Sequence, residues 1–257
     1  MAAPLNLILT VPPSQLRRAQ PLGLPLAHMA YRLGESSQLL RSEIPLHLRG
    51  GLMVLSDTGF SGQGDPEQLC RQIIRECAAR GFDGILCDFD LPPLPSLSRL
   101  TALLCETAIR RGWRCYVPLS YASAAPRARL LVPSALSGGS LELRLRELAE
   151  QYGPHRLALA VDRMAEDFFL PAPTGCGVPL SRDELSRRLQ QMKPAVFFSR
   201  DLCAHYFTYM SRENGAHFVL FDTADSIRMK FRLAQAAGLS DAVLAYPQVD
   251  DLLPQLL

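Results

Sequence analysis

The stretch "GFDGILCDFDLP", residues 81–92, places Asp88 and Asp90 two residues apart in an apolar run typical of a buried strand. Because side chains alternate across a strand, the two carboxylates share one face, and Cys87 and Phe89 share the other. Two carboxylates so close resist joint ionisation, so we expect one proton to be shared at a raised apparent pKa. Such a pair suits general acid catalysis of glycoside cleavage. The alternative is a structural pair, held by arginine or backbone amides at a strand end.

The elements that must position this pair alternate along the chain as short apolar strands and amphipathic helices. This alternation is typical of βα units and a parallel sheet, and eight units in about 250 residues indicate a (β/α)₈ TIM barrel. The whole chain, 1–257, is interpreted as one such domain, with a small insertion at 169–221 between late barrel strands. The predicted strands are 5–11, 27–33, 52–56, 84–90, 114–119, 130–133, 156–162, 195–199, 217–222 and 242–246. The predicted helices are 65–81, 96–112, 140–153, 181–192 and 223–238.

The competing fold is an open doubly wound sheet with a nucleotide at its switch point. No GxGxxG or phosphate-binding loop follows an early strand, and "SGG" at 137–139 is too short to be specific. The barrel is therefore preferred, and no cofactor is expected.

Composition and charge argue against several classes of function, among them nucleic-acid binding, a membrane span and metal binding. The net charge is +2 with the basic residues scattered, so no nucleic-acid partner is expected. No apolar stretch approaches the roughly 20 residues of a membrane span, and residues 1–18 resemble a first strand more than a secretion signal. Seven cysteines without a CxxC pair favour reduced thiols in the cytoplasm. The five histidines are dispersed, so no metal site is expected.

The segment 81–90 resembles the fourth-strand signature of family 18 glycoside hydrolases, the chitinase-like group, which reads Phe-Asp-Gly-x-Asp-x-Asp-x-Glu. "LALAVDRMAEDFFLP" at 157–171 ends in the register of a Tyr-Asp-Trp-x-Leu-Pro segment of the spore-cortex, peptidoglycan-directed branch. Residues 206–246 are similar to the strand, acidic turn, Lys-bearing helix and last strand of that branch. The resemblance covers about residues 52–250.

The resemblance implies a function and roles for the acidic pair. In that family the final Glu of the signature protonates the glycosidic oxygen, and the Asp two residues earlier orients the N-acetyl group of the substrate. Asp90 stands in the place of the acid and Asp88 in that of the orienting Asp. The implied partner is a glycan containing N-acetylglucosamine, such as peptidoglycan or chitin. The sequence departs from the family at Leu86 for the first Asp, at 130–139 where a sixth-strand Tyr is missing, and at Ala245 for a Trp. Hydrolysis is therefore expected to be weak or lost.

Five further residues are candidate substrate contacts, and a sixth, Asp222, has two alternative roles. Asp57 ends the third strand and could replace the acid, although a turn-capping role is its alternative. Asp162 ends the strand at 156–162 and is expected to face the barrel mouth. Asp167 and Phe168 stand for the Asp and Trp of the Tyr-Asp-Trp segment, and Tyr246 follows the position of the missing Trp. Asp222 ends the segment 217–222, which resembles a seventh barrel strand, and it is assigned either a helix-capping role or a sugar contact.

Two rival functions stay open beside a weak glycosidase. One is a non-catalytic descendant that binds glycan, or a protein partner during sporulation, through the same mouth. The other is an intracellular enzyme with altered chemistry on the same barrel. The expected location is cytoplasmic, with deposition on a spore as the alternative.

Overall fold

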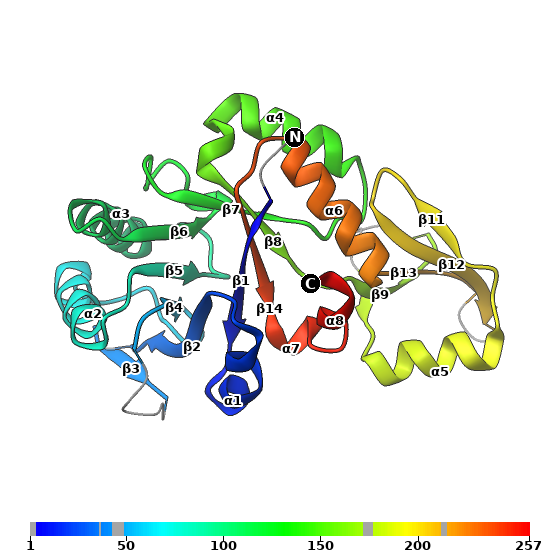
Figure 1. The fold of residues 1–257 in the computed structure, drawn as a ribbon, viewed down its shortest axis with the longest axis horizontal. Helices are drawn as coiled ribbons and strands as arrows, with labels where there is room; N and C mark the ends of the chain where they lie inside the picture. The colour runs from blue at the N-terminus through cyan, green and yellow to red at the C-terminus, as the bar shows by residue number, and fades with distance from the viewer. Residues whose placement is uncertain (1–3, 36, 43–48, 172–176, 212–214) are drawn as a thin grey trace.

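Eight parallel strands close into a barrel flanked by helices, which confirms the predicted (β/α)₈ architecture (Figure 1). The closing contact is the parallel pairing of β1 with β2, in which Leu9 lies opposite Leu26. The computed structural model describes residues 4–35, 37–42, 49–171, 177–211 and 215–257. In chain order the barrel strands are β1 (Asn6–Val11), β2 (Leu26–Leu33), β4 (Leu52–Ser56), β5 (Gly84–Asp88), β6 (Arg114–Pro118), β7 (Arg129–Pro133), β8 (Leu157–Val161) and β14 (Asp241–Ala245).

The helices around the barrel begin and end close to where the sequence signals place them. Asp65 caps α2 by accepting the backbone N–H groups of Glu67 and Gln68, and Gly81 ends it in the left-handed conformation with φ of 64°. A short antiparallel strand, rather than a helix, follows β2, and a single 3₁₀ turn follows β6. The remaining elements are α1 (Leu16–Ala19), β3 (Leu39–Arg41), α2 (Pro66–Arg80), α3 (Pro95–Arg110), α4 (Leu141–Tyr152), α6 (Ala224–Ala236), α7 (Tyr246–Val249) and α8 (Leu253–Leu256).

The barrel strands bury apolar side chains on both faces. Leu86 packs inside the barrel with Val54 and Tyr116, whereas Ile85 and Cys87 pack in the layer between the barrel and its helices. This confirms the predicted alternation along the fourth barrel strand. The strand itself ends at Asp88, so the predicted extension to residue 90 is wrong.

A second sheet is inserted between β8 and α6 and lies on the side of the barrel opposite α2 and α3 (Figure 1). It begins at Ala165, slightly earlier than predicted, because β9 pairs along its whole length with β13. One face of this sheet is covered by α5 through Leu185 and Leu189. Its elements are β9 (Ala165–Phe169), β10 (Val178–Pro179), α5 (Arg182–Met192), β11 (Phe197–Ser199), β12 (Ala204–Ser211) and β13 (Gly215–Phe221).

The reading of residues 217–222 as a seventh barrel strand is wrong. These residues belong mostly to β13, which pairs antiparallel with β9 and β12, and the seventh barrel strand is β8. An apolar run of this length fits either sheet, and only the pairing partner separates the two.

A buried ion pair ties the ends of the insertion to α6. Asp222, directly after β13, accepts hydrogen bonds from Lys230 Nζ at 2.7 Å and from the backbone N–H of Met164 at 2.9 Å. Its second oxygen accepts from Ser226 Oγ at 2.7 Å. Asp222 and Lys230 are each 1% exposed. Because Met164 lies where the chain enters the insertion and Asp222 where it leaves, this one carboxylate fixes both ends.

We expect Lys230→Met to lower the free energy of unfolding by about 3–5 kcal/mol, because it leaves a buried carboxylate without its cation. Urea denaturation followed by circular dichroism measures the change. The matched control is Arg146→Gln, which breaks the exposed Glu142–Arg146 pair of 2.8 Å on α4 and should cost about 0.5 kcal/mol or less. Equal costs for the two variants would contradict the anchoring role.

Candidate functional site

Carboxylates gather where β5 and β8 end. Asp88 is the last residue of β5 and follows the inward-facing Leu86 on the same side of the strand. Asp162 comes directly after β8. Since all barrel strands run in one direction, both side chains lie at the carboxyl end of the barrel, where barrel enzymes carry their active sites.

Two cavities open on either side of Asp88. The larger has a volume of about 500 Å³ and contains Asp88, Asp162, Arg144 and Ser120. The smaller has a volume of about 290 Å³ and is lined by Asp88 together with Asp90 and other residues. The apolar wall of the larger cavity comprises Phe89, Pro118, Leu119, Leu131, Pro133 and Ala160. The smaller one also contains Arg32, Ser56 and Thr58.

The surroundings of Asp88 favour its protonated form. Asp88 is open to solvent at the mouth, but the cavity walls still reduce its hydration, and this burial is the first cause that raises its pKa. The negative charges of Asp90, Asp162 and Asp57 raise the pKa further, in that order. Three neighbouring carboxylates therefore contribute to the raised pKa of Asp88, and the sharing of a proton between Asp88 and Asp90 stays a prediction.

Asp162 has a different balance of charges. Burial raises its pKa, the ammonium group of Lys230 lowers it, and Asp90 raises it again. The net direction is upward. The ion pair beneath the insertion therefore also acts on the mouth, because its lysine offsets part of the cost of ionising Asp162.

Asp57 is 2% exposed and faces backbone. Its two oxygens accept the N–H groups of Asp90 at 3.1 Å and of Leu91 at 2.9 Å. Tyr121 donates its hydroxyl to the carbonyl oxygen of Leu91 at 3.0 Å, from the other side of the same loop. This is the turn-holding role that the sequence offered as the alternative, and neither mouth cavity is lined by Asp57.

Asp167 and Phe168 lie in β9, within the inserted sheet. Burial alone would raise the pKa of Asp167, but hydrogen bonds from Arg188, Tyr209 and His217 lower it. The Tyr209 hydroxyl lies 2.7 Å and His217 Nδ1 lies 3.0 Å from the Asp167 carboxylate. These contacts hold the sheet to α5, so the predicted glycan contact of Asp167 is not supported by its placement.

Phe168 points to the opposite face of the inserted sheet. It is 5% exposed and packs with Met164, Ala204 and Leu220. Tyr246, at the start of α7, is 7% exposed and packs in the layer outside the barrel strands. Neither residue lines a mouth cavity, so the predicted substrate contacts at both positions are replaced by core packing.

Two arginines at the mouth were missed from the sequence. Arg144 comes from the first turns of α4, directly after the loop that follows β7, and Arg32 comes from the end of β2. Their positions in the sequence could have identified them. A residue at a strand end or in the first turn of the next helix lies at the carboxyl-terminal face of a barrel, where the active site is found. Neither arginine stands out by its spacing, because the basic residues are scattered along the whole sequence.

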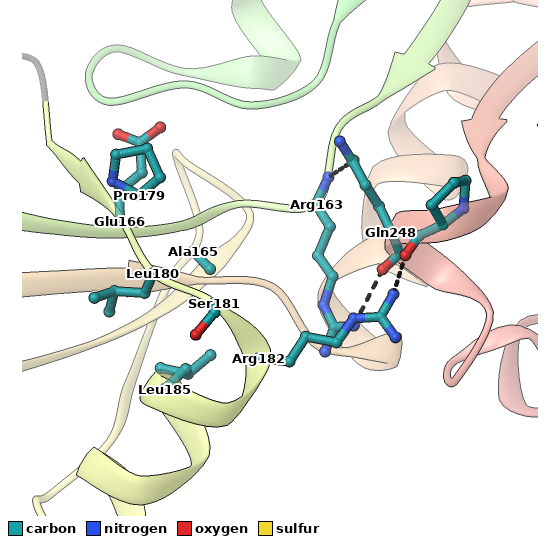
Figure 2. Close-up of a pocket in the computed structure, with 10 residues that line it drawn as sticks. Arg163, Ala165, Glu166, Pro179, Leu180, Ser181, Arg182, Leu185 and Gln248 are labelled. Atoms are coloured by element: carbon teal, nitrogen blue, oxygen red, sulfur yellow. Dashed lines mark hydrogen bonds between the residues drawn. The ribbon is translucent and has the colours of Figure 1, made fainter. Parts of the chain in front are cut away.

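A third cavity, of about 310 Å³, separates the insertion from α7 (Figure 2). Arg163 and Arg182 line it, and both guanidinium groups already bind acceptors near the C-terminus. Arg163 donates to Asp251 at 2.7 Å and to the Gln248 carbonyl at 3.1 Å, and Arg182 donates to Asp250 at 2.6 Å. These arginines join the insertion to α7 and to the residues that directly follow it.

Two further findings concern the described part of the chain. Within it, no cluster of three or more His, Cys, Asp and Glu side chains could hold a metal ion. Across the same residues, every helix is too short or too polar to cross a bilayer.

Comparison with known proteins places the fold. No protein-family model matches the sequence, and no curated protein matches it. The spore cortex-lytic enzyme SleL of Bacillus cereus has a TM-score of 0.71 at 14% identity, covering 100% of this chain and 75% of that chain. A chitinase from Chromobacterium violaceum ATCC 12472 has a TM-score of 0.69 at 15% identity, covering 95% and 96% of the two chains. A GH18 chitinase from Cycas revoluta, in complex with (GlcNAc)₃, has a TM-score of 0.65 at 14% identity, covering 97% and 98%. The chain therefore shares the fold of family 18 glycoside hydrolases, as the resemblance predicts.

We expect Asp88→Asn to stabilise the protein at neutral pH. The folded state raises the pKa of Asp88, so the stability that this group contributes is complete below its unfolded pKa and is lost as the pH rises through the folded value. Removing the charge should therefore raise the free energy of unfolding at pH 7, by at most about 1 kcal/mol after allowance for solvent screening. The gain should shrink as the pH falls toward about 4.

Urea denaturation at several pH values measures this difference. The matched control is Asp83→Asn at the opposite end of β5, where the carboxylate is exposed and accepts from Arg114 at 2.9 Å. Asp83→Asn should not raise the free energy of unfolding at any pH. A pH-independent effect of Asp88→Asn would show that the mouth does not favour the protonated carboxyl.

Proposed function

We propose that this barrel binds glycans containing N-acetylglucosamine at its carboxylate mouth and hydrolyses them weakly. The observation that carries the proposal is the 500 Å³ cavity at the carboxyl end of the barrel, with Asp88 and Asp162 on one apolar-walled surface. Ligand cavities in proteins are commonly about 300–1,000 Å³, so a cavity of this size can hold one or two sugar rings.

The composition of this cavity suits a pyranose. Pro118, Leu119 and Pro133 offer an apolar surface for the C–H face of a sugar ring. Carboxylates and a serine hydroxyl accept the hydroxyl and amide hydrogens of the ring substituents. The fold neighbours support the same ligand class, since the Cycas revoluta chitinase was solved with (GlcNAc)₃ and its mutant with (GlcNAc)₄.

Weak hydrolysis follows from the residues at the positions of the family's machinery. Asp90 is one methylene shorter than the family's Glu, which withdraws the carboxyl by about 1.5 Å. A misplacement of about 1 Å can cost on the order of 10²-fold in rate. The sixth barrel strand, β7, offers no Tyr, and Ala245 ends the last strand where the family has a Trp.

The second candidate function is binding without turnover, of a glycan or of a protein partner during sporulation. Leu86 favours it, because an apolar residue buried in the barrel interior has replaced the first Asp of the signature. Peptidoglycan is the ligand expected with a spore-associated location, and a chitin-like glycan is the alternative. A cytoplasmic or spore-associated location belongs to the same proposal, and cell fractionation with an antibody to the chain would test it.

The proposal is tested by binding and turnover of N-acetylglucosamine oligomers and peptidoglycan fragments. We expect oligomers to raise the melting temperature of the wild type and to be cleaved slowly. Asp90→Glu should increase turnover by about tenfold or more, since it returns the carboxyl to its reach. Asp83→Asn, at the other end of β5, should change neither measurement. A melting temperature unmoved by every oligomer and fragment would refute glycan binding.

A further inference from the structure

We propose that the residual hydrolysis uses Asp88 as the general acid and Asp162 as the charged partner, within the larger cavity. This inference rests on the proposed glycan-binding function and adds a catalytic residue from the seventh barrel strand. It places the reaction between strands β5 and β8 rather than on the Asp88–Asp90 pair.

Asp88 lines both mouth cavities, whereas Asp162 lines only the larger of the two and Asp90 only the smaller. Asp88 and Asp162 line the same 500 Å³ cavity, and the carboxyl ends of β6 and β7 contribute to its walls. Asp90 lines the smaller, 290 Å³ cavity instead. A sugar in the larger cavity therefore contacts Asp88 and Asp162 together.

The loop after β5 is fixed at the backbone of Asp90, which lines the smaller cavity. Its backbone N–H is held by Asp57 at 3.1 Å, and the next N–H by the second oxygen of Asp57 at 2.9 Å. Tyr121 restrains the same loop, because its hydroxyl donates to the carbonyl oxygen of Leu91 at 3.0 Å. Its ring also contacts the ring of Phe89 edge-on. Asp57 cannot serve as the replacement acid, since both its oxygens are engaged.

The charges around the two carboxylates give them different tasks. The charged groups that shift the pKa of Asp88 are all carboxylates, and each of them favours its protonated form. Asp162 has the Lys230 ammonium nearby, which favours its ionised form relative to Asp88. Arg144 lines the same cavity from α4. The pKa of each carboxyl group is raised, but only Asp162 has a cation that acts against the rise, so the acid role falls to Asp88 and the anion role to Asp162.

The reaction balances with these two groups and water. The Asp88 carboxyl gives its proton to the glycosidic oxygen while the bond from that oxygen to the anomeric carbon breaks, and the bonding electron pair stays on the oxygen. The Asp162 carboxylate stabilises the positive charge that develops on the sugar ring. Water then bonds to the anomeric carbon and returns a proton to the Asp88 carboxylate. The net reaction consumes one water per bond.

The test compares variants on N-acetylglucosamine oligomers that differ in their leaving group. Asp88→Asn should lose about 100-fold or more in kcat/KM with a sugar leaving group, because general acid catalysis contributes about 10²–10⁴-fold. With a 2,4-dinitrophenyl leaving group, which needs no proton, it should lose less than about tenfold. Asp162→Asn should lose about 100-fold or more with both substrates.

Two further variants complete the set. Asp90→Asn should lower kcat/KM less than Asp88→Asn or Asp162→Asn does. The basic limb of its pH profile of kcat/KM should move to lower pH, because the Asp90 charge raises the pKa of Asp88. Asp83→Asn is the matched control. Melting temperatures establish that each variant is folded, and Asp162→Glu, which keeps the charge, should recover part of the activity lost in Asp162→Asn.

Three results separate the two proposals. Abolition of turnover by Asp90→Asn, with Asp162→Asn active, would overturn the Asp88–Asp162 pair. A wild type that binds oligomers but cleaves neither substrate would also overturn the pair and leave glycan binding standing. A wild type that binds no oligomer would overturn the proposed function itself.

Discussion

The closure of eight parallel strands is the constraint on which the mouth depends. Asp88 and Asp162 are far apart in the chain, and β6 and β7 lie between their strands. Because every strand in a closed parallel barrel ends on the same rim, both side chains reach one cavity. The chain enters the insertion at Met164 and leaves it at Asp222, and the contacts of Asp222 with Met164 and Lys230 hold these two points together.

The role of each carboxylate in the barrel depends on the groups that surround it. Asp57 and Asp222 are buried, and their oxygens accept N–H, hydroxyl or ammonium groups, so their charge is compensated and their role is structural. Asp88 and Asp162 line open space and have raised pKa values. Residue type alone does not separate these two groups of aspartates.

Much of the architecture was predictable because it rests on local signals. The caps of α2, the alternation around Leu86 and the overall strand–helix order all follow from periodicity and cap chemistry. The place of β13 was not predictable, because its pairing with β9 and β12 joins residues whose contact no local pattern records. For the same reason Phe168 and Tyr246, assigned to the sugar from the register of the resemblance, proved to be core residues.

The repulsion among carboxylates at the mouth argues for a ligand rather than for a purely structural rim. Carboxylates that raise the pKa of Asp88 cost stability at neutral pH, and no described hydrogen bond to the Asp88 side chain offsets that cost. An asparagine or serine at either position would fill the same space without the repulsion. A sugar offers what the pair lacks, since its hydroxyl and amide hydrogens satisfy an ionised carboxylate and its glycosidic oxygen accepts the proton of a neutral one. The stability lost through this repulsion is therefore offset only when a ligand fills the cavity.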